Sequence, residues 1–137
     1  MAYEQPGTRY GFLAADIDMS NKATWQFAPV WEGPAVNTVG QGFGGAALVA
    51  KGARTDPPIG ILQNNPVQGE AGTVVVTGVS KAIAGGNIAV GAMLTPNAGG
   101  TALITATAGT YACARALESG VSGAIISVEL RQFGVQS

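Results

Sequence analysis

The stretch Ala124–Phe133, with the sequence AIISVELRQF, gives the clearest indication of the fold class of this chain. Its residues Ile126, Val128 and Leu130 fall at every second position, with polar or charged residues between them. Alternation with a period of two places the apolar side chains on one face of an extended strand. The stretch therefore predicts a β-strand with one buried and one solvated face.

Other stretches of strand length extend this pattern toward the N-terminus. The run Thr73–Thr77 is β-branched throughout, which is typical of a strand buried on both faces. In Thr110–Leu117, alanine occupies every second position, so another layer can approach that face closely. Further candidate strands are Ile59–Gln63, Val79–Ile83 and Ala102–Thr107, whereas Ala46–Lys51 fits either one helical turn or a short strand. Because glycine-, asparagine- and proline-rich turns separate these runs, we predict an all-β chain with a small β-barrel or sandwich-like domain.

The aromatic residues are concentrated near the N-terminus, where seven of the nine fall within the first 45 positions. Large rigid rings are favoured where one protein surface grips another. We therefore predict that residues 1–45 form an extended, aromatic-rich N-terminal arm and interface segment, followed by a β-rich domain over residues 46–137. The predicted interface residues are Tyr10, Phe12, Trp25, Phe27, Trp31 and Phe43. In the alternative interpretation, these rings fold back and cover the core of their own chain, because burial and interface formation use the same chemistry.

The composition excludes several classes of function. Seven basic residues stand against eight acidic ones, and this balance argues against nucleic-acid binding. The chain has no histidine, the usual general base and a frequent zinc ligand. Its single cysteine allows no internal disulfide, and no apolar run approaches the roughly 20 residues of a membrane-spanning helix. Only 11% of the residues are charged, so we expect partners to cover part of the surface.

Two motifs with a binding interpretation are weak. Gly40–Gly45 matches the G-x-G-x-x-G pattern, but any helix after it is broken at Gly52, and the acidic residue that a dinucleotide site requires comes too early. Asp16 and Asp18 would point to the same side of a strand, but calcium needs six to eight oxygen ligands and no nearby cluster supplies the others. We therefore predict neither a nucleotide cofactor nor a metal site.

Two residues with nucleophilic side chains are equally unconvincing as catalysts. Ser80 and Lys81 are neighbours on a candidate strand, so their side chains should point to opposite faces. Cys113 lies between two alanines and has no histidine partner, which predicts a small buried hydrophobic residue. The prediction is that the chain is not an enzyme.

A family resemblance rests on the order of five short motifs from residue 58 onward. The motifs are Pro58–Leu62 (PIGIL), Val74–Lys81 (VVVTGVSK), Ala89–Thr95 (AVGAMLT), Ala112–Gly120 (ACARALESG) and Gly123–Leu130 (GAIISVEL). In this order they resemble the small head-decoration, or capsid cement, proteins of tailed bacteriophages. The resemblance implies a non-enzymatic structural protein without cofactors, made in the host cytoplasm and bound to the outer surface of the virion head. It also implies two partners, the major capsid protein and further copies of itself in a homotrimer at threefold or quasi-threefold positions.

We therefore hypothesise that the N-terminal arm, residues 1–45, reaches a partner and adds a strand to the edge of the partner's sheet. The uncharged stretch Ala82–Ala114 would then pack against other subunits of the trimer. One alternative is a phage tail or fibre component. Another is a carbohydrate-binding β-module that uses Trp25 or Trp31 as a stacking platform with Asp16 or Asp18 beside it. A small hydrolase ranks last.

Overall fold

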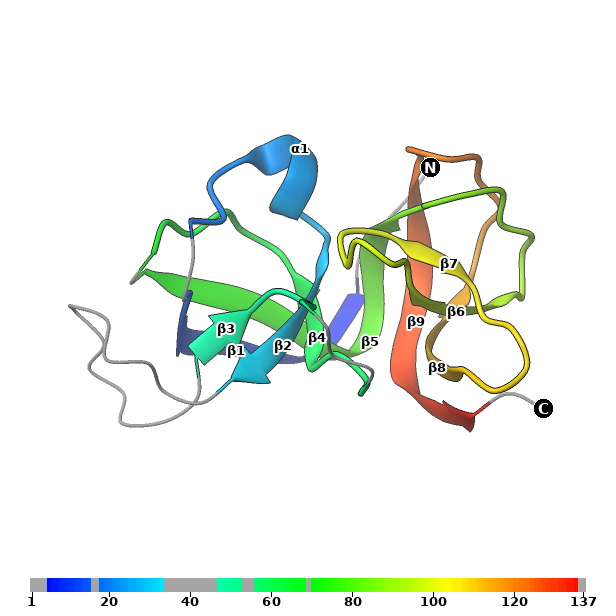
Figure 1. Ribbon diagram of the computed structural model, residues 1–137, viewed down its shortest axis with the longest axis horizontal. Helices are drawn as coiled ribbons and strands as arrows, with labels where there is room; N and C mark the ends of the chain where they lie inside the picture. Colours follow the sequence, from blue (N-terminus) through cyan, green and yellow to red (C-terminus); the bar gives the residue numbers. More distant parts are fainter. Residues whose placement is uncertain (1–4, 16–17, 34–46, 53–55, 69, 136–137) are drawn as a thin grey trace.

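The computed structural model of the chain describes residues 5–15, 18–33, 47–52, 56–68 and 70–135. Within these ranges the chain is almost entirely β-structure with one short helix, which confirms the all-β prediction (Figure 1). The elements are β1 (Gln5–Ala14), α1 (Lys22–Trp25), β2 (Pro29–Gly33), β3 (Ala47–Val49), β4 (Gly60–Leu62), β5 (Ala71–Ile83), β6 (Met93–Pro96), β7 (Leu103–Thr105), β8 (Tyr111–Ala116) and β9 (Ile125–Val135).

The strands form one continuous antiparallel arrangement in the order β3-β2-β4-β5-β9-β8-β6-β7, and β1 also pairs with β5. Strand β7, the last in this order, lies next to the segment that follows β5. Ala84, just after β5, forms a parallel bridge with Leu103 of β7, and the Gly85 N–H donates to the Leu103 carbonyl at 2.8 Å. The C-terminal strands therefore nearly close into a small barrel, which lies on the right in Figure 1.

The long strand β5 connects the two halves of the molecule. It pairs with β1 and β4 through its first part and with β9 from Gly78 onward. The sequence predicted two strands here, Thr73–Thr77 and Val79–Ile83, whereas the structure joins them into one. Gly78 has a φ of 97°, which glycine adopts without the steric cost of a side chain, so the strand changes direction there without ending (Figure 1).

Two hydrophobic cores lie on opposite faces of the β4–β5 wall. Ile61 and Val75 belong to the larger core, which the C-terminal strands enclose. Their chain neighbours Leu62 and Val74 belong to the smaller core, which the N-terminal half encloses. Successive side chains of a strand point to opposite faces, so this pair of strands supplies both cores at once. Both Val74 and Val75 are fully buried, as the β-branched run predicted.

The strand patterns of the C-terminal half are confirmed in detail. The apolar residues Ile126, Val128 and Leu130 of β9 are all buried in the larger core. The alanines that alternate along β8 are also buried and pack there or beside it. Ser127 departs from the pattern, because it is buried as well although it lies on the other face of β9. The ambiguous Ala46–Lys51 run contains strand β3, not a helix.

The N-terminal segment takes part in the same sheet arrangement. Strand β1 pairs with β5 from Gln5↔Val79 to Ala14↔Ala71, and β2 pairs with β4. The first 33 residues thus contribute two strands and the helix α1 to the structure of their own chain. The division at residue 45, and the reach of the segment to a partner, stay predictions.

Candidate interaction surface

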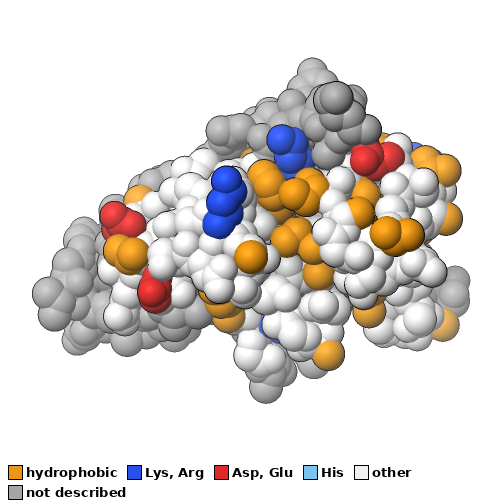
Figure 2. All heavy atoms as spheres, turned by 90° about the horizontal axis from the view of Figure 1, so that it is seen from above, with side chains coloured by type: hydrophobic (Ala, Val, Ile, Leu, Met, Phe, Trp, Pro, Cys, Tyr) orange, Lys and Arg blue, Asp and Glu red, His pale blue; other side chains and the backbone are white. Residues whose placement is uncertain are grey.

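An apolar groove of about 360 Å³ lies between α1 and the adjacent ends of β5 and β9. Its lining residues are Lys22, Ala23, Gln26, Phe27, Ile83, Gly123 and Ile125. Figure 2 looks onto the upper side of the molecule, where hydrophobic side chains gather near the middle of the visible face beside Lys or Arg side chains. Apolar surface that is rimmed by polar residues in this way is typical of interaction sites.

Local hydrogen bonds fix the α1 wall of the groove. The Asn21 side chain accepts from the Ala23 N–H at 3.1 Å and caps the four-residue helix. Two residues after the helix, Phe27 has a φ of 66°, and its N–H donates to the Leu62 carbonyl of β4 at 2.8 Å. A bulky residue in this left-handed region costs roughly 1–2 kcal/mol. Such a conformation persists only where the surroundings impose it, so Phe27 is held at the groove against a local backbone preference.

A positively charged side chain lies over the Phe27 ring. The Lys81 ammonium lies 5.6 Å from the ring centroid, within the range of a cation–π interaction. Ser80, the preceding residue, is fully buried and faces the other way, with its hydroxyl accepting from the Gln63 side-chain amide at 3.0 Å. The prediction that Ser80 and Lys81 point to opposite faces is therefore confirmed.

A second apolar surface lies at the end of the barrel, on the loops that follow β5 and β8. Val90 is 67% exposed, Val121 is 66% exposed, and Leu117 is also exposed. Ile88 and Gly120 hold the two loops together through reciprocal backbone hydrogen bonds of 2.8 and 3.0 Å. These side chains are therefore displayed on an ordered backbone, which lowers the entropy cost of binding through them.

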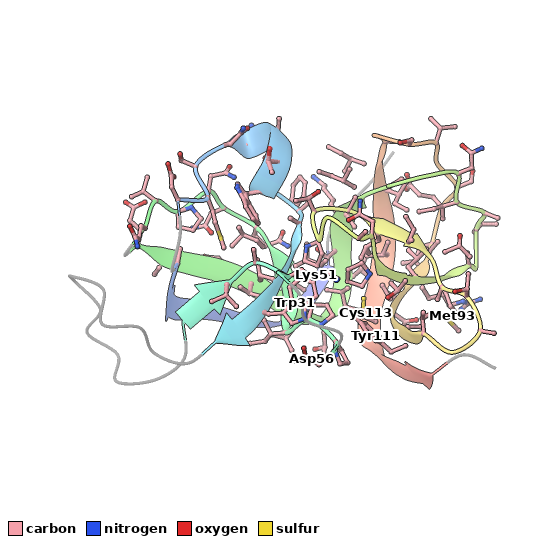
Figure 3. The ribbon with its side chains drawn as sticks, viewed as in Figure 1. Trp31, Lys51, Asp56, Met93, Tyr111 and Cys113 are labelled. Carbon is pink, nitrogen blue, oxygen red and sulfur yellow. The ribbon has the colours of Figure 1, made fainter. Side chains whose placement is uncertain are left out.

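The predicted anchor Trp31 lies inside the chain. Its side chain is fully buried, and its indole N–H donates to the Asp56 carbonyl at 2.8 Å. Figure 3 shows Trp31 beside the segment that carries Asp56. This placement supports the interpretation in which the ring covers the core of its own chain, and it leaves Trp31 no exposed face for stacking on a sugar. Trp25 is partly buried and packs against the smaller core.

Among the predicted interface residues whose side chains the structure describes, Trp25, Phe27 and Trp31, only Phe27 lines the groove. Tyr10 and Phe12 belong to β1, where the Tyr10 backbone lies opposite Val74, and their side chains lie outside the described residues, as does Phe43 as a whole. Lys22, Ile83 and Ile125 were not predicted to be parts of this surface. The sequence did contain a signal for Ile125, because it is an apolar residue at an outward position of the predicted strand Ala124–Phe133. In the structure it is 49% exposed.

Two ionisable side chains, Cys113 and Asp18, have shifted pKa values. Cys113 is 5% exposed, and burial raises the pKa of its thiol to about 12, so the thiol is neutral at physiological pH. This confirms its prediction as a buried hydrophobic residue. Asp18 is exposed, and hydrogen bonds from Ser20, including one of 2.9 Å from its N–H, lower the pKa of the Asp18 carboxyl.

The remaining motifs with a chemical interpretation lie partly beyond the described residues. Asp16 and Gly40–Gly45 are both outside them. In the part of the chain that the structure describes, no three His, Cys, Asp or Glu residues group in a way that could hold a metal ion. Over the same ranges, no helix is both long enough and apolar enough to cross a membrane.

The fold of this chain is similar to that of a phage protein of known structure. A solved structure described as "head fiber gp8.5 N base in bacteriophage phi29" superimposes on this chain with a TM-score of 0.67. The match covers 95% of this chain and all of the other, at 15% sequence identity. No protein-family model and no curated protein sequence matches the chain.

Proposed function

We propose that this chain is a structural protein of a tailed-phage virion that binds the outer surface of the capsid and stabilises it as a homotrimer. The observation that carries the proposal is the fold shared over nearly the whole chain with the N base of a phage head fibre protein. The motif order from Pro58 to Leu130, which resembles capsid-decoration proteins, supports the same class independently.

The surface of the molecule supports a binding role more than a catalytic one. The groove beside Phe27 and the loops that carry Val90 and Val121 both offer apolar side chains to a partner. Repetition of modest contacts over several copies would give the assembled protein an avidity far above that of one subunit. In this proposal the partners are the major capsid protein and other copies of the chain, with no cofactor and no enzymatic step.

Quantitative co-sedimentation with heads of the phage that encodes the protein tests the proposal. Saturable binding in a fixed ratio to the major capsid protein is expected, and it should be stronger on expanded heads if maturation creates the site. Failure of the folded protein to bind either unexpanded or expanded heads would refute capsid decoration.

A second candidate is the base of a head or tail fibre, which the similarity to a fibre base favours. Labelling of intact virions with an antibody against the chain, followed by electron microscopy, separates the two. A label distributed over the capsid lattice supports decoration, whereas a label at the foot of a fibre supports the second candidate.

A further inference from the structure

We infer that the groove beside α1 binds the loop Leu117–Val121 of a second copy of the chain, in a head-to-tail contact. This inference rests on the proposed self-association and assigns residues to it. Each copy would contribute one groove and one loop. Because the two surfaces differ, the contact can repeat from copy to copy, and it closes a ring such as the proposed trimer when the rotation between copies is a whole fraction of a turn.

The groove has an apolar floor and a positive rim. Phe27, Ile83 and Ile125 provide the apolar surface. Lys22 belongs to the lining, and the Lys81 ammonium lies over the Phe27 ring. Among the described residues that line the groove, Lys22 is the only charged residue, and its charge is positive. An occupant that combines aliphatic side chains with a carboxylate would complement this surface.

The loop Leu117–Val121 has these two properties. Its sequence LESGV contains Glu118, the one charged residue between Arg115 and Glu129. Leu117 is 38% exposed, and Val121 is 66% exposed. A partner that inserts Val121 against the groove floor would bring a carboxylate toward the lysines of the rim.

The loop is held so that it cannot fill the groove of its own chain. Reciprocal hydrogen bonds between Ile88 and Gly120 fix its middle. The Gly123 N–H donates to the Ala84 carbonyl at 2.8 Å and fixes the turn that follows. Gly123 and Ile125 form one wall of the groove, so the loop continues into that wall and is presented outward. The backbone hydrogen bonds therefore hold the loop in place before a second copy binds it.

Charge reversal tests the contact. Lys22→Glu and Glu118→Lys would each place like charges across the interface, and we expect each to weaken self-association at least tenfold. The double variant, with Lys22→Glu and Glu118→Lys together, restores opposite charges and should recover most of the lost affinity. Glu70→Lys is the matched control, because Glu70 is exposed and immediately precedes β5, at the end of that strand remote from the groove.

Sedimentation equilibrium of the free chain, up to about 100 μM, gives the association constants, and thermal unfolding shows whether each variant is folded. A monomeric wild-type chain over this range would overturn the inference. Single variants that associate like the wild type, or a double variant no better than the single ones, would overturn it as well. Co-sedimentation with phage heads is measured in parallel. If the wild-type chain does not self-associate but still binds phage heads, the inferred contact is wrong and the proposed function stands.

Discussion

Replacement of Trp31 separates a core role from an interface role. Trp31→Phe removes the indole N–H that donates to the Asp56 carbonyl and also removes part of a fully buried side chain. Loss of one hydrogen bond costs about 1 kcal/mol, and full truncation of a buried tryptophan to alanine costs about 3–5 kcal/mol. Because phenylalanine retains one ring, we expect Trp31→Phe to lower the free energy of unfolding by about 2–3 kcal/mol.

Urea unfolding followed by circular dichroism measures this change. For a chain of this length the same loss lowers the melting temperature by roughly 6–12 °C. Trp25→Phe is the control, because Trp25 is only partly buried, and it should cost about 1 kcal/mol or less. Acrylamide should quench the fluorescence of the Trp25→Phe variant weakly, since its remaining tryptophan is buried. An unchanged unfolding free energy in Trp31→Phe, together with weaker binding to phage heads, would refute the core assignment.

Three further predictions concern packing, pH and salt. Gly60→Ala should destabilise the chain by about 3 kcal/mol in the same urea assay, because a Cβ atom there would lie 2.2 Å from the Val75 carbonyl oxygen and 2.7 Å from a Val74 methyl group. An alanine variant of wild-type stability would contradict this close approach. The pKa of the buried Cys113 thiol is raised to about 12 from an ordinary value of 9.0, so the unfolded chain loses this proton first as pH rises, and stability falls above pH 9. From pH 8 to pH 10 the wild type should lose about 1.4 kcal/mol more than Cys113→Ala does, and equal losses would contradict the assignment. Binding to heads should weaken less than about threefold between 50 and 300 mM salt, because few charges take part, and a steeper dependence in co-sedimentation would point to a charge-steered interface.

Most strands of the fold could be predicted because local sequence patterns specify them. The alternation of Ile126, Val128 and Leu130 predicted strand β9 because a strand that separates a core from solvent requires that period. The β-branched run around Val74 and Val75 predicted a strand buried on both faces, because such a strand needs apolar residues at consecutive positions and not at every second one. The single strand β5 was not foreseen, since the pattern breaks at Gly78, whose positive φ depends on the strands paired on either side.

The candidate surface was less predictable. Phe27 was predicted as an interface residue from residue type alone, and that role stays a prediction, whereas its neighbours in the groove come from α1, β5 and β9, which are distant in sequence. The same residue-type reasoning placed Trp31 in an interface, although the structure buries it. Aromatic rings favour buried and interfacial positions alike, so the distinction depends on how the strands pair.

Composition and periodicity are local properties, so they were enough to establish a chain with little charge and no histidine and to predict its all-β class and most of its strands. The wall that β4 and β5 form between two cores, with Ile61 and Leu62 on opposite sides, became visible in the folded chain alone. The same holds for the meeting of Phe27, Lys81 and Ile125 at one surface. These contacts depend on long-range strand pairing, which no local pattern specifies, because the register is fixed by what each face buries against.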